Sequence, residues 1–218
     1  MPRELYEQHV RILEQMITSM ARYTIEALNK AMVAFRTRDV ELAKEVKKQD
    51  ALIDSLQTQV EDEIATIIAT QQPVATDLRF LLCTVKMAGE LERCADHAAH
   101  LAKATKLFKD EPQWRQTSFI EEMTRIGAEM ISTAAEAFIA RSASKAREAA
   151  AMDDGIDHLH KEVIGQMLER LRERPEDAEK ASKFIQVSGY LERLGDHMTN
   201  ACEYIVYMVE SVHVELNG

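Results

Sequence analysis

Two nine-residue segments, one hundred positions apart, carry acidic residues at the spacing of a metal site on a helix. Residues 89–97 read GELERCADH and residues 189–197 read GYLERLGDH, so six of the nine positions are identical. Residues four apart share one face of an α-helix, so Glu92 with Asp96, and Glu192 with Asp196, would each stack two carboxylates. Like charges at this spacing repel, and a cation opposite them would relieve the repulsion. The duplication predicts one such site in each half of the chain.

A second acidic pair precedes each of these segments. Asp50 with Asp54, and Asp153 with Asp157, are again four residues apart. If the helix of each pair faces the helix of the repeated segment, four carboxylates converge in each half. Carboxylate oxygens suit hard or borderline cations such as Mg²⁺, Mn²⁺ or Fe. Because four carboxylates exceed the charge of one divalent ion, we expect a cluster of two or more ions, or added protons, in each site.

The next turn of the same helical face adds one further candidate to each half. His100 follows the first acidic stack, whereas Asn200, a weaker ligand, follows the second, so the two sites need not bind metal equally. His97 and His197 lie one step off this face, where a histidine is more often packed or hydrogen-bonded than a ligand. The predicted metal ligands are therefore Asp50, Asp54, Glu92, Asp96 and His100 in the first half and Asp153, Asp157, Glu192, Asp196 and Asn200 in the second.

A structural interpretation of the acidic residues stays open. Arg93 and Arg193 each stand three residues before the aspartate of their segment and could neutralise Asp96 and Asp196. The acids would then belong to a solvated salt-bridge face of a helical scaffold, which adds little stability. Against this interpretation, the acids, the arginine and the histidine recur together at one register.

An enzyme with a dinuclear metal site, a hydrolase or an oxidoreductase, is the alternative that paired carboxylates permit. Asp157 and His160 have the carboxylate-x-x-His spacing of di-iron bundles, but no Glu-x-x-His occurs on the third predicted helix or in the repeated acidic segment of the sixth. The sequence also lacks an H-E-x-x-H motif, a glycine-rich phosphate loop and a nucleophile elbow. We find no residue set that defines a catalysed reaction, and we expect that the protein is not an enzyme.

The elements that carry these residues are predicted to be six long helices. With 7 glycines, 4 prolines and 6% aromatic residues, the chain has few helix breakers. Apolar periodicity predicts helices over about 5–36, 40–70 and 73–108, and then over 116–140, 144–172 and 176–214. Pro73 is expected in the first turn of the third helix.

Short connections make consecutive helices antiparallel neighbours. The predicted fold is therefore all-α, with two tandem three-helix up-down bundles. Residues 109–112 form the clearest boundary, which divides the chain into residues 1–110 and 111–218.

The overall charge and the cysteines suggest where the protein works. A formal charge of -10, from 37 acidic and 27 basic residues, disfavours binding to nucleic acid. The three cysteines lie outside any C-x-x-C pattern, which favours free thiols in a reducing cytoplasm. No window has the roughly 18 to 20 apolar residues of a membrane span, and the first residues lack a signal peptide's apolar core. We expect a cytoplasmic protein that meets a membrane only through partners.

Three segments of the chain match the pattern of a known family. They are residues 71–79 (QQPVATDLR), residues 91–97 and residues 190–200. With its length and duplicated plan, the chain resembles the PhoU family of phosphate-signalling regulators over nearly its whole extent. The resemblance implies that the E-x-x-x-D motifs bind clusters of divalent or trivalent metal ions, namely Fe, Zn, Mg or Mn.

The same resemblance implies a biological role. It implies a negative regulator of the phosphate regulon and of phosphate uptake, which acts in signal transduction as an adaptor. The implied partners are the ATPase of the Pst phosphate transporter and a PhoR-type sensor histidine kinase, and a homodimer is expected from the family. The halves are not fully alike, since Asp177-Ala178-Glu179 stands where the first half has Asp77-Leu78-Arg79, and Cys94-Ala95 replaces the Leu194-Gly195 of the second motif. We therefore do not expect full symmetry between the two sites.

Overall fold

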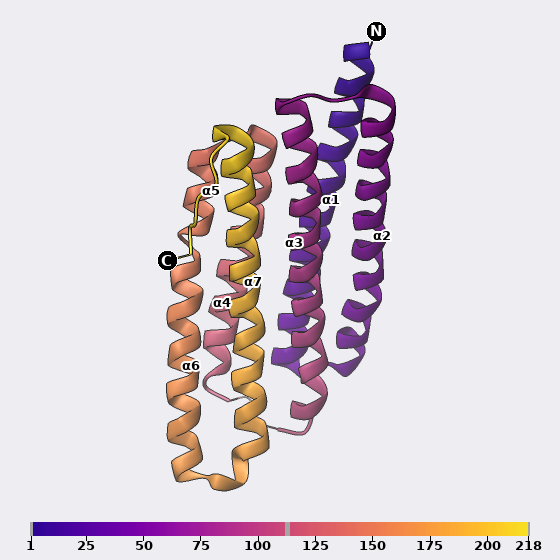
Figure 1. Ribbon diagram of the computed structural model, residues 1–218. Coiled ribbons are helices and arrows are strands. Elements are labelled where there is room, and N and C mark those ends of the chain that lie inside the picture. Colours follow the sequence, from indigo (N-terminus) through magenta and orange to yellow (C-terminus); the bar gives the residue numbers. More distant parts are fainter. Residues whose placement is uncertain (1, 112–113, 218) are drawn as a thin grey trace.

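The computed structural model describes residues 2–111 and 114–217, and over these residues the fold is helical, without a β-strand. The first half contains α1 (Pro2–Thr37), α2 (Val40–Gln71) and α3 (Thr76–Ala104), followed by the 3₁₀ helix η1 (Thr105–Phe108). The second contains α4 (Thr117–Ala140), α5 (Ala143–Ala150), α6 (Asp153–Glu173), the 3₁₀ helix η2 (Pro175–Asp177) and α7 (Ala178–Glu210). The predicted all-α fold of two tandem three-helix bundles is confirmed (Figure 1). No helix among the described residues is both long and apolar enough to span a membrane.

One predicted helix, over residues 144–172, is divided in two. Met152 N–H donates to the carbonyl of Ala149, and Gly155 N–H donates to the carbonyl of Met152, so the chain tightens into i to i+3 bonds between α5 and α6. Figure 1 shows the two helices one above the other. The interruption places Asp153 in the first turn of a new helix, where the positive end of the helix dipole favours a carboxylate.

Two helix boundaries differ from the predicted ones for backbone reasons. The third helix begins at Thr76 and not at Pro73, because Ala75 before it has a φ of 45°. The last helix ends at Glu210 and not at residue 214, because Ser211 has a φ of 64° and turns the backbone left-handed. Residues 212–217 therefore leave the helix axis.

The acidic residues of α2 flank its buried stripe. The buried residues of this helix recur at helical spacing and are Val46, Ile53, Val60, Ile64 and Ile67. They pack α2 against α1 and α3. Asp39 caps the helix, since its Oδ1 accepts from the backbone N–H groups of Glu41 and Leu42, at 3.0 Å each. This packing holds Asp50 and Asp54 beside α3.

The two halves meet along α3 and α7, which run antiparallel at the centre of the molecule (Figure 1). Cys94 Sγ lies 3.7 Å from the carbonyl oxygen of Leu194, so the two repeated segments contact each other. A single cluster of buried apolar residues continues through both halves. The repeated segments thus form part of the interface between the halves as well as one wall of each acidic cluster.

The connection between the halves is itself packed. Trp114 is 4% exposed and stacks on Phe184 of α7, with 5.7 Å between the ring centroids. Phe108 of η1 lies edge-on to Trp114 at 5.6 Å. Pro112, which belongs to the predicted boundary, lies outside the described residues.

Candidate functional site

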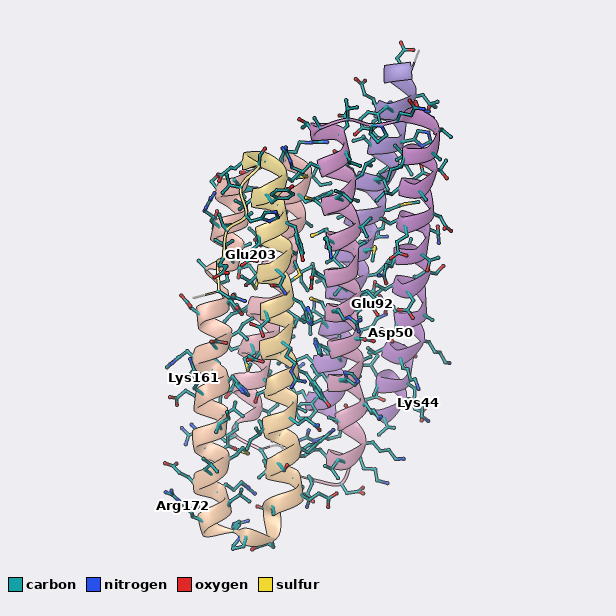
Figure 2. All side chains as sticks on the ribbon, viewed as in Figure 1. Lys44, Asp50, Glu92, Lys161, Arg172 and Glu203 are labelled. Carbon is teal, nitrogen blue, oxygen red and sulfur yellow. The ribbon has the colours of Figure 1, made fainter. Side chains whose placement is uncertain are left out.

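The first acidic cluster lies between α2 and α3. Asp50 and Asp54 come from α2, Glu92 and Asp96 come from α3, and Figure 2 shows Asp50 and Glu92 close together between these helices. Burial raises the pKa of Asp50, and the charges of Asp96 and Asp54 raise it further. Burial also raises the pKa of Glu92, followed by the charge of Asp96 and by smaller effects of Asp54 and Asp50. Because such effects decline with distance, the four carboxylates are neighbours.

The second acidic cluster lies between α6 and α7 and repeats this arrangement. Burial, followed by the charges of Asp196 and Asp157, raises the pKa of Asp153 to about 7. Burial and then the charges of Asp196 and Asp157 raise the pKa of Glu192. Burial and then Asp157 raise the pKa of Asp196. The structure thus brings four predicted acids together in each half, while their role as metal ligands stays a prediction.

One oxygen in each cluster is buried without a partner. Asp50 Oδ1 and Asp153 Oδ1 have no hydrogen-bond partner within residues 2–111 and 114–217. The two aspartates occupy equivalent places in the repeat. A buried and unsatisfied carboxylate oxygen is unfavourable, and a cation would satisfy it. The all-oxygen donor set fits Mg²⁺, Mn²⁺ or an iron ion better than a soft metal.

The carboxylates are neighbours without yet forming a closed coordination sphere. Over the part of the chain that the structure describes, no three His, Cys, Asp or Glu side chains are placed so that they could hold one ion. Binding would therefore require side-chain rotations that bring the carboxylates together. Rotations of exposed and half-buried side chains are fast, so this requirement is compatible with a binding site.

The second cluster is more enclosed than the first. Asp153 is 8% exposed, and its Oδ2 accepts a hydrogen bond of 3.2 Å from Thr199 Oγ1. Gly195 makes room for Asp153, since a Cβ atom at position 195 would lie 2.0 Å from Asp153 Oδ1. The first repeat has Ala95 at this position, and Asp50 is only half-buried. Sequence reasoning missed Thr199, because its counterpart Ala99 has no oxygen.

Arg93 explains only part of the first cluster. Arg93 Nη1 lies 3.7 Å from Asp96 Oδ2, and Arg93 Nε lies 3.6 Å from Glu92 Oε2. The Arg93 side chain is 60% exposed, so these pairs contribute at most about 1 kcal/mol. They leave the buried oxygen of Asp50 unsatisfied. The solvated salt-bridge interpretation therefore accounts for the rim of the cluster and not for its interior.

Positions 100 and 200 extend toward the other half of the molecule. The His100 ring stacks on Tyr190 of α7, with 4.9 Å between centroids, although its charge also acts to lower the pKa of Asp50. Asn200 lines a cavity of about 330 Å³ together with Glu92 and Arg93 of the first half. His100 therefore lies between the first cluster and α7, whereas Asn200 lies at the interface between the halves, beside residues of the first half.

The two repeated histidines meet at the same interface. The rings of His97 and His197 stack with centroids 5.4 Å apart. His197 Nδ1 lies 2.7 Å from Glu90 Oε2, whereas both ring nitrogens of His97 are buried without a partner among the described residues. Burial, aided by the charge of His197, lowers the pKa of His97 to about 4, so this ring is neutral at pH 7. These contacts agree with the expectation that the two histidines are packed side chains.

Comparison with known proteins assigns the fold and its duplication to one family. The PhoU domain family matches residues 17–105 and 120–205. A phosphate-specific transport system accessory protein PhoU homolog from Clostridium acetobutylicum is 32% identical over 221 residues, covering 100% of both chains. A homolog of the same description from Streptococcus pneumoniae serotype 4 is 30% identical over 219 residues, covering 99% of this chain and 100% of the other.

Solved structures agree with this assignment. The crystal structure of PhoU from Pseudomonas aeruginosa has a TM-score of 0.90 at 24% identity, over 95% of this chain and 100% of that chain, which supports the fold. The crystal structure of the phosphate transport system regulatory protein PhoU from Streptococcus pneumoniae has a TM-score of 0.89 at 26% identity, over 96% and 99%. Since the family matches both halves of this chain, and the Clostridium acetobutylicum relative aligns with it from end to end, the chain belongs to the PhoU family.

Proposed function

We propose that this protein is an accessory regulator of a phosphate-specific transport system, and that its two acidic clusters bind metal ions. The observation that carries the metal proposal is the pair of equivalent clusters, each with four carboxylates and one buried, unpartnered oxygen. The family supports the transport proposal, because its relatives are described as accessory proteins of phosphate-specific transport.

The residues that would hold the ions come from two helices in each half. They are Asp50, Asp54, Glu92 and Asp96 between α2 and α3, and Asp153, Asp157, Glu192 and Asp196 between α6 and α7. When bound, divalent or trivalent ions would supply the positive charge that offsets the repulsion within each cluster. The carboxylates would then tie α2 to α3 and α6 to α7. This role is structural, and it gives the helices a fixed surface for partners.

The proposed regulator restrains phosphate uptake and the phosphate regulon when phosphate is ample. It would act as an adaptor between the ATPase of a Pst-type transporter and a PhoR-type histidine kinase, and it would reach the membrane through these partners. Some large apolar side chains on its helices and loops are available for contact, among them Val74, Leu82 and Leu168, which are 72%, 52% and 50% exposed. A second copy of the chain in a homodimer could use the same kind of contact.

Deletion of the gene tests the regulatory proposal. In phosphate-rich medium, the deletion strain should express alkaline phosphatase and take up phosphate at derepressed levels. A plasmid copy of the gene should restore repression. If the deletion strain keeps both activities at the repressed level, the protein is not a negative regulator of this system.

Elemental analysis tests the metal proposal. Protein dialysed free of loose ions should retain stoichiometric metal, and Asp96→Asn combined with Asp196→Asn should lose it. Asp62→Asn, which changes an exposed acid on α2, is the matched control and should retain the metal. Ions at a hundred times their Kd should also raise the free energy of unfolding by about 2.7 kcal/mol per site. Equal metal loss in the control would refute the assignment of the clusters.

The enzyme alternative has no comparable support in the geometry. In the second half, His160 Nδ1 lies 2.8 Å from Ser188 Oγ. Ser188 is fully buried and donates to the carbonyl of Ile185 at 2.9 Å, so its hydroxyl is engaged and shielded from a substrate. We expect metal-loaded protein to leave phosphate esters intact. Turnover that Glu92→Ala abolishes would establish the enzyme instead.

A further inference from the structure

The segment that follows α7, residues 212–217, folds back along that helix toward the second acidic cluster. Ser211, with its φ of 64°, ends α7 and reverses the chain, and its N–H donates to the carbonyl of Tyr207. In Figure 1 the yellow segment runs from the end of α7 past α5 and stops near the beginning of α6. Asp153 and Asp157 belong to this part of α6.

Three contacts fix the segment along α7. The His213 ring stacks on the Tyr207 ring, with centroids 4.0 Å apart and an interplanar angle of 11°. Leu216 N–H donates a hydrogen bond of 2.7 Å to Glu203 Oε1. Beyond it, the amide Nδ2 of Asn217 lies 3.4 Å from Asp196 Oδ1 and donates to it. The segment therefore ends on an acid of the second cluster.

The side chains of the segment show that it is docked on the core. Val214 and Leu216 are half-buried and pack against the apolar cluster, while His213, Glu215 and Asn217 are exposed. This alternation is the pattern of an extended chain with one face against the protein. Apolar burial and the Glu203 hydrogen bond thus hold Asn217 beside Asp196.

Among residues 2–111 and 114–217, the first cluster has no counterpart of this segment, because the chain continues from α3 through η1 toward α4. Its aspartate Asp96 meets the exposed side chain of Arg93 instead, at 3.7 Å. An exposed arginine can swing away without disturbing the backbone. An ion approaching Asp196 Oδ1 must displace an amide that the docked segment carries.

We propose that residues 212–217 form a cap on the second metal site, with Asn217 and Glu203 as positioning residues, and that the cap slows the exchange of ions there. The inference rests on the proposed metal binding, and it adds that the two sites differ in kinetics. Ions leave the first site when side chains rotate, whereas the second site also needs the segment to lift.

Metal release from the intact 218-residue chain tests the cap. Protein loaded with Mn²⁺ and freed of loose ions is mixed with excess chelator, and released Mn²⁺ is followed by electron paramagnetic resonance. We expect a fast and a slow phase. The slow phase should vanish in the double variant of the second cluster, Asp157→Asn with Asp196→Asn. It should persist in the double variant of the first cluster, Asp54→Asn with Asp96→Asn.

Variants of the segment then isolate its effect. Deletion of residues 212–218 should accelerate the slow phase roughly tenfold, which corresponds to about 1.4 kcal/mol in the barrier, and leave the fast phase unchanged. Asn217→Ala keeps the apolar contacts and should accelerate the slow phase by a smaller factor. Glu215→Gln removes the acidic side chain of the segment but none of these contacts, so it should release Mn²⁺ at the original rates.

The outcomes separate the cap from the metal sites. If the deletion and Asn217→Ala both leave the slow phase unchanged, the cap is refuted while the metal sites stand. Equal acceleration of both phases by the deletion would indicate a general loosening of the fold. A Glu215→Gln effect as large as that of the deletion would indicate that the charge of the segment alone slows release. Either result overturns the cap. If the intact chain retains no Mn²⁺, both the cap and the metal proposal are refuted.

Discussion

Asp153 is more deeply buried than any other predicted ligand, at 8% exposed, and like charges surround it. Asp157 lies on the same helix as Asp153, and Glu192 and Asp196 face Asp153 from α7. Thr199 donates a hydrogen bond to Asp153 Oδ2. A carboxyl group in such surroundings resists ionisation. Its pKa of about 7 therefore makes the stability of the metal-free protein depend on pH.

The sign of this dependence follows from proton binding. An unfolded aspartate has a pKa near 3.8, so between about pH 4 and pH 7 the folded state holds a proton that the unfolded state has released. The free energy of unfolding should fall as pH rises through this window, by at most about 1.4 kcal/mol per pH unit. Urea unfolding of chelator-treated protein at several pH values measures it. Asp153→Asn should flatten the dependence, and an equally steep slope in this variant would contradict the assignment.

Gly195 offers a steric test of the same pocket. Gly195→Ala should destabilise metal-free protein by about 1 to 3 kcal/mol, because the new methyl group overlaps Asp153 Oδ1. Gly189→Ala, on the same helix, is the control, since its nearest new contact is His160 Cε1 at 3.7 Å. The control should gain up to about 1 kcal/mol from helix propensity. Similar gains for both variants in urea unfolding would show that position 195 is not crowded.

At the scale of the elements, α4 joins the two halves by packing against both α1 and α7. The close approach occurs at Gly127, where a Cβ atom would lie 2.9 Å from Leu194 Cδ2 and 3.7 Å from Leu28 Cδ2. Leu28 belongs to α1 and Leu194 to α7. A small residue at this point therefore lets three helices meet.

Gly127→Val should separate these helices and cost about 1 to 3 kcal/mol of folding free energy, as measured by thermal or urea unfolding. Gly165→Val is the matched control on α6, because Gly165 is exposed and a Cβ atom there meets nothing within 4 Å. The control should change stability by no more than about 0.5 kcal/mol. An equally small effect at position 127 would mean that the contact can relax.

At the scale of the whole molecule, the two repeats are not independent bodies. Their buried residues form one cluster, and Phe35 of α1 lies 5.9 Å from Phe184 of α7, centroid to centroid. Trp114, in the connection between the halves, stacks on the same phenylalanine. Exposing either half alone would leave a large apolar surface in water.

We therefore expect one cooperative unfolding transition. The chain has 1 tryptophan, so fluorescence reports Trp114 at the junction, while far-ultraviolet circular dichroism reports all helices. Both signals should have the same midpoint in urea, as in a two-state transition. Two separate midpoints would show that the halves unfold independently.

The helices and the register of the acids were predictable because both depend on local spacing. Apolar residues three and four apart specify a helical face, and Glu92 with Asp96 share a face wherever that helix packs. The same spacing brought Asp50 and Asp54 to one side of α2. The division between α5 and α6 was not predicted, because the apolar periodicity continues through residues 144–172. A tightened turn at Met152 interrupts the helix just before Asp153, Asp154 and Gly155, which are weak helix formers.

Long-range packing decided the rest. Three features join residues that are 21 or more positions apart, and helical periodicity does not encode such contacts. They are the antiparallel contact of α3 with α7, the room that Gly195 leaves for Asp153, and the docking of Asn217 on Asp196. The sequence by itself therefore determined which acids stand together on each helix. Only the tertiary structure decided which cluster is deeply buried and which is covered, since burial depends on the neighbours that the whole fold supplies.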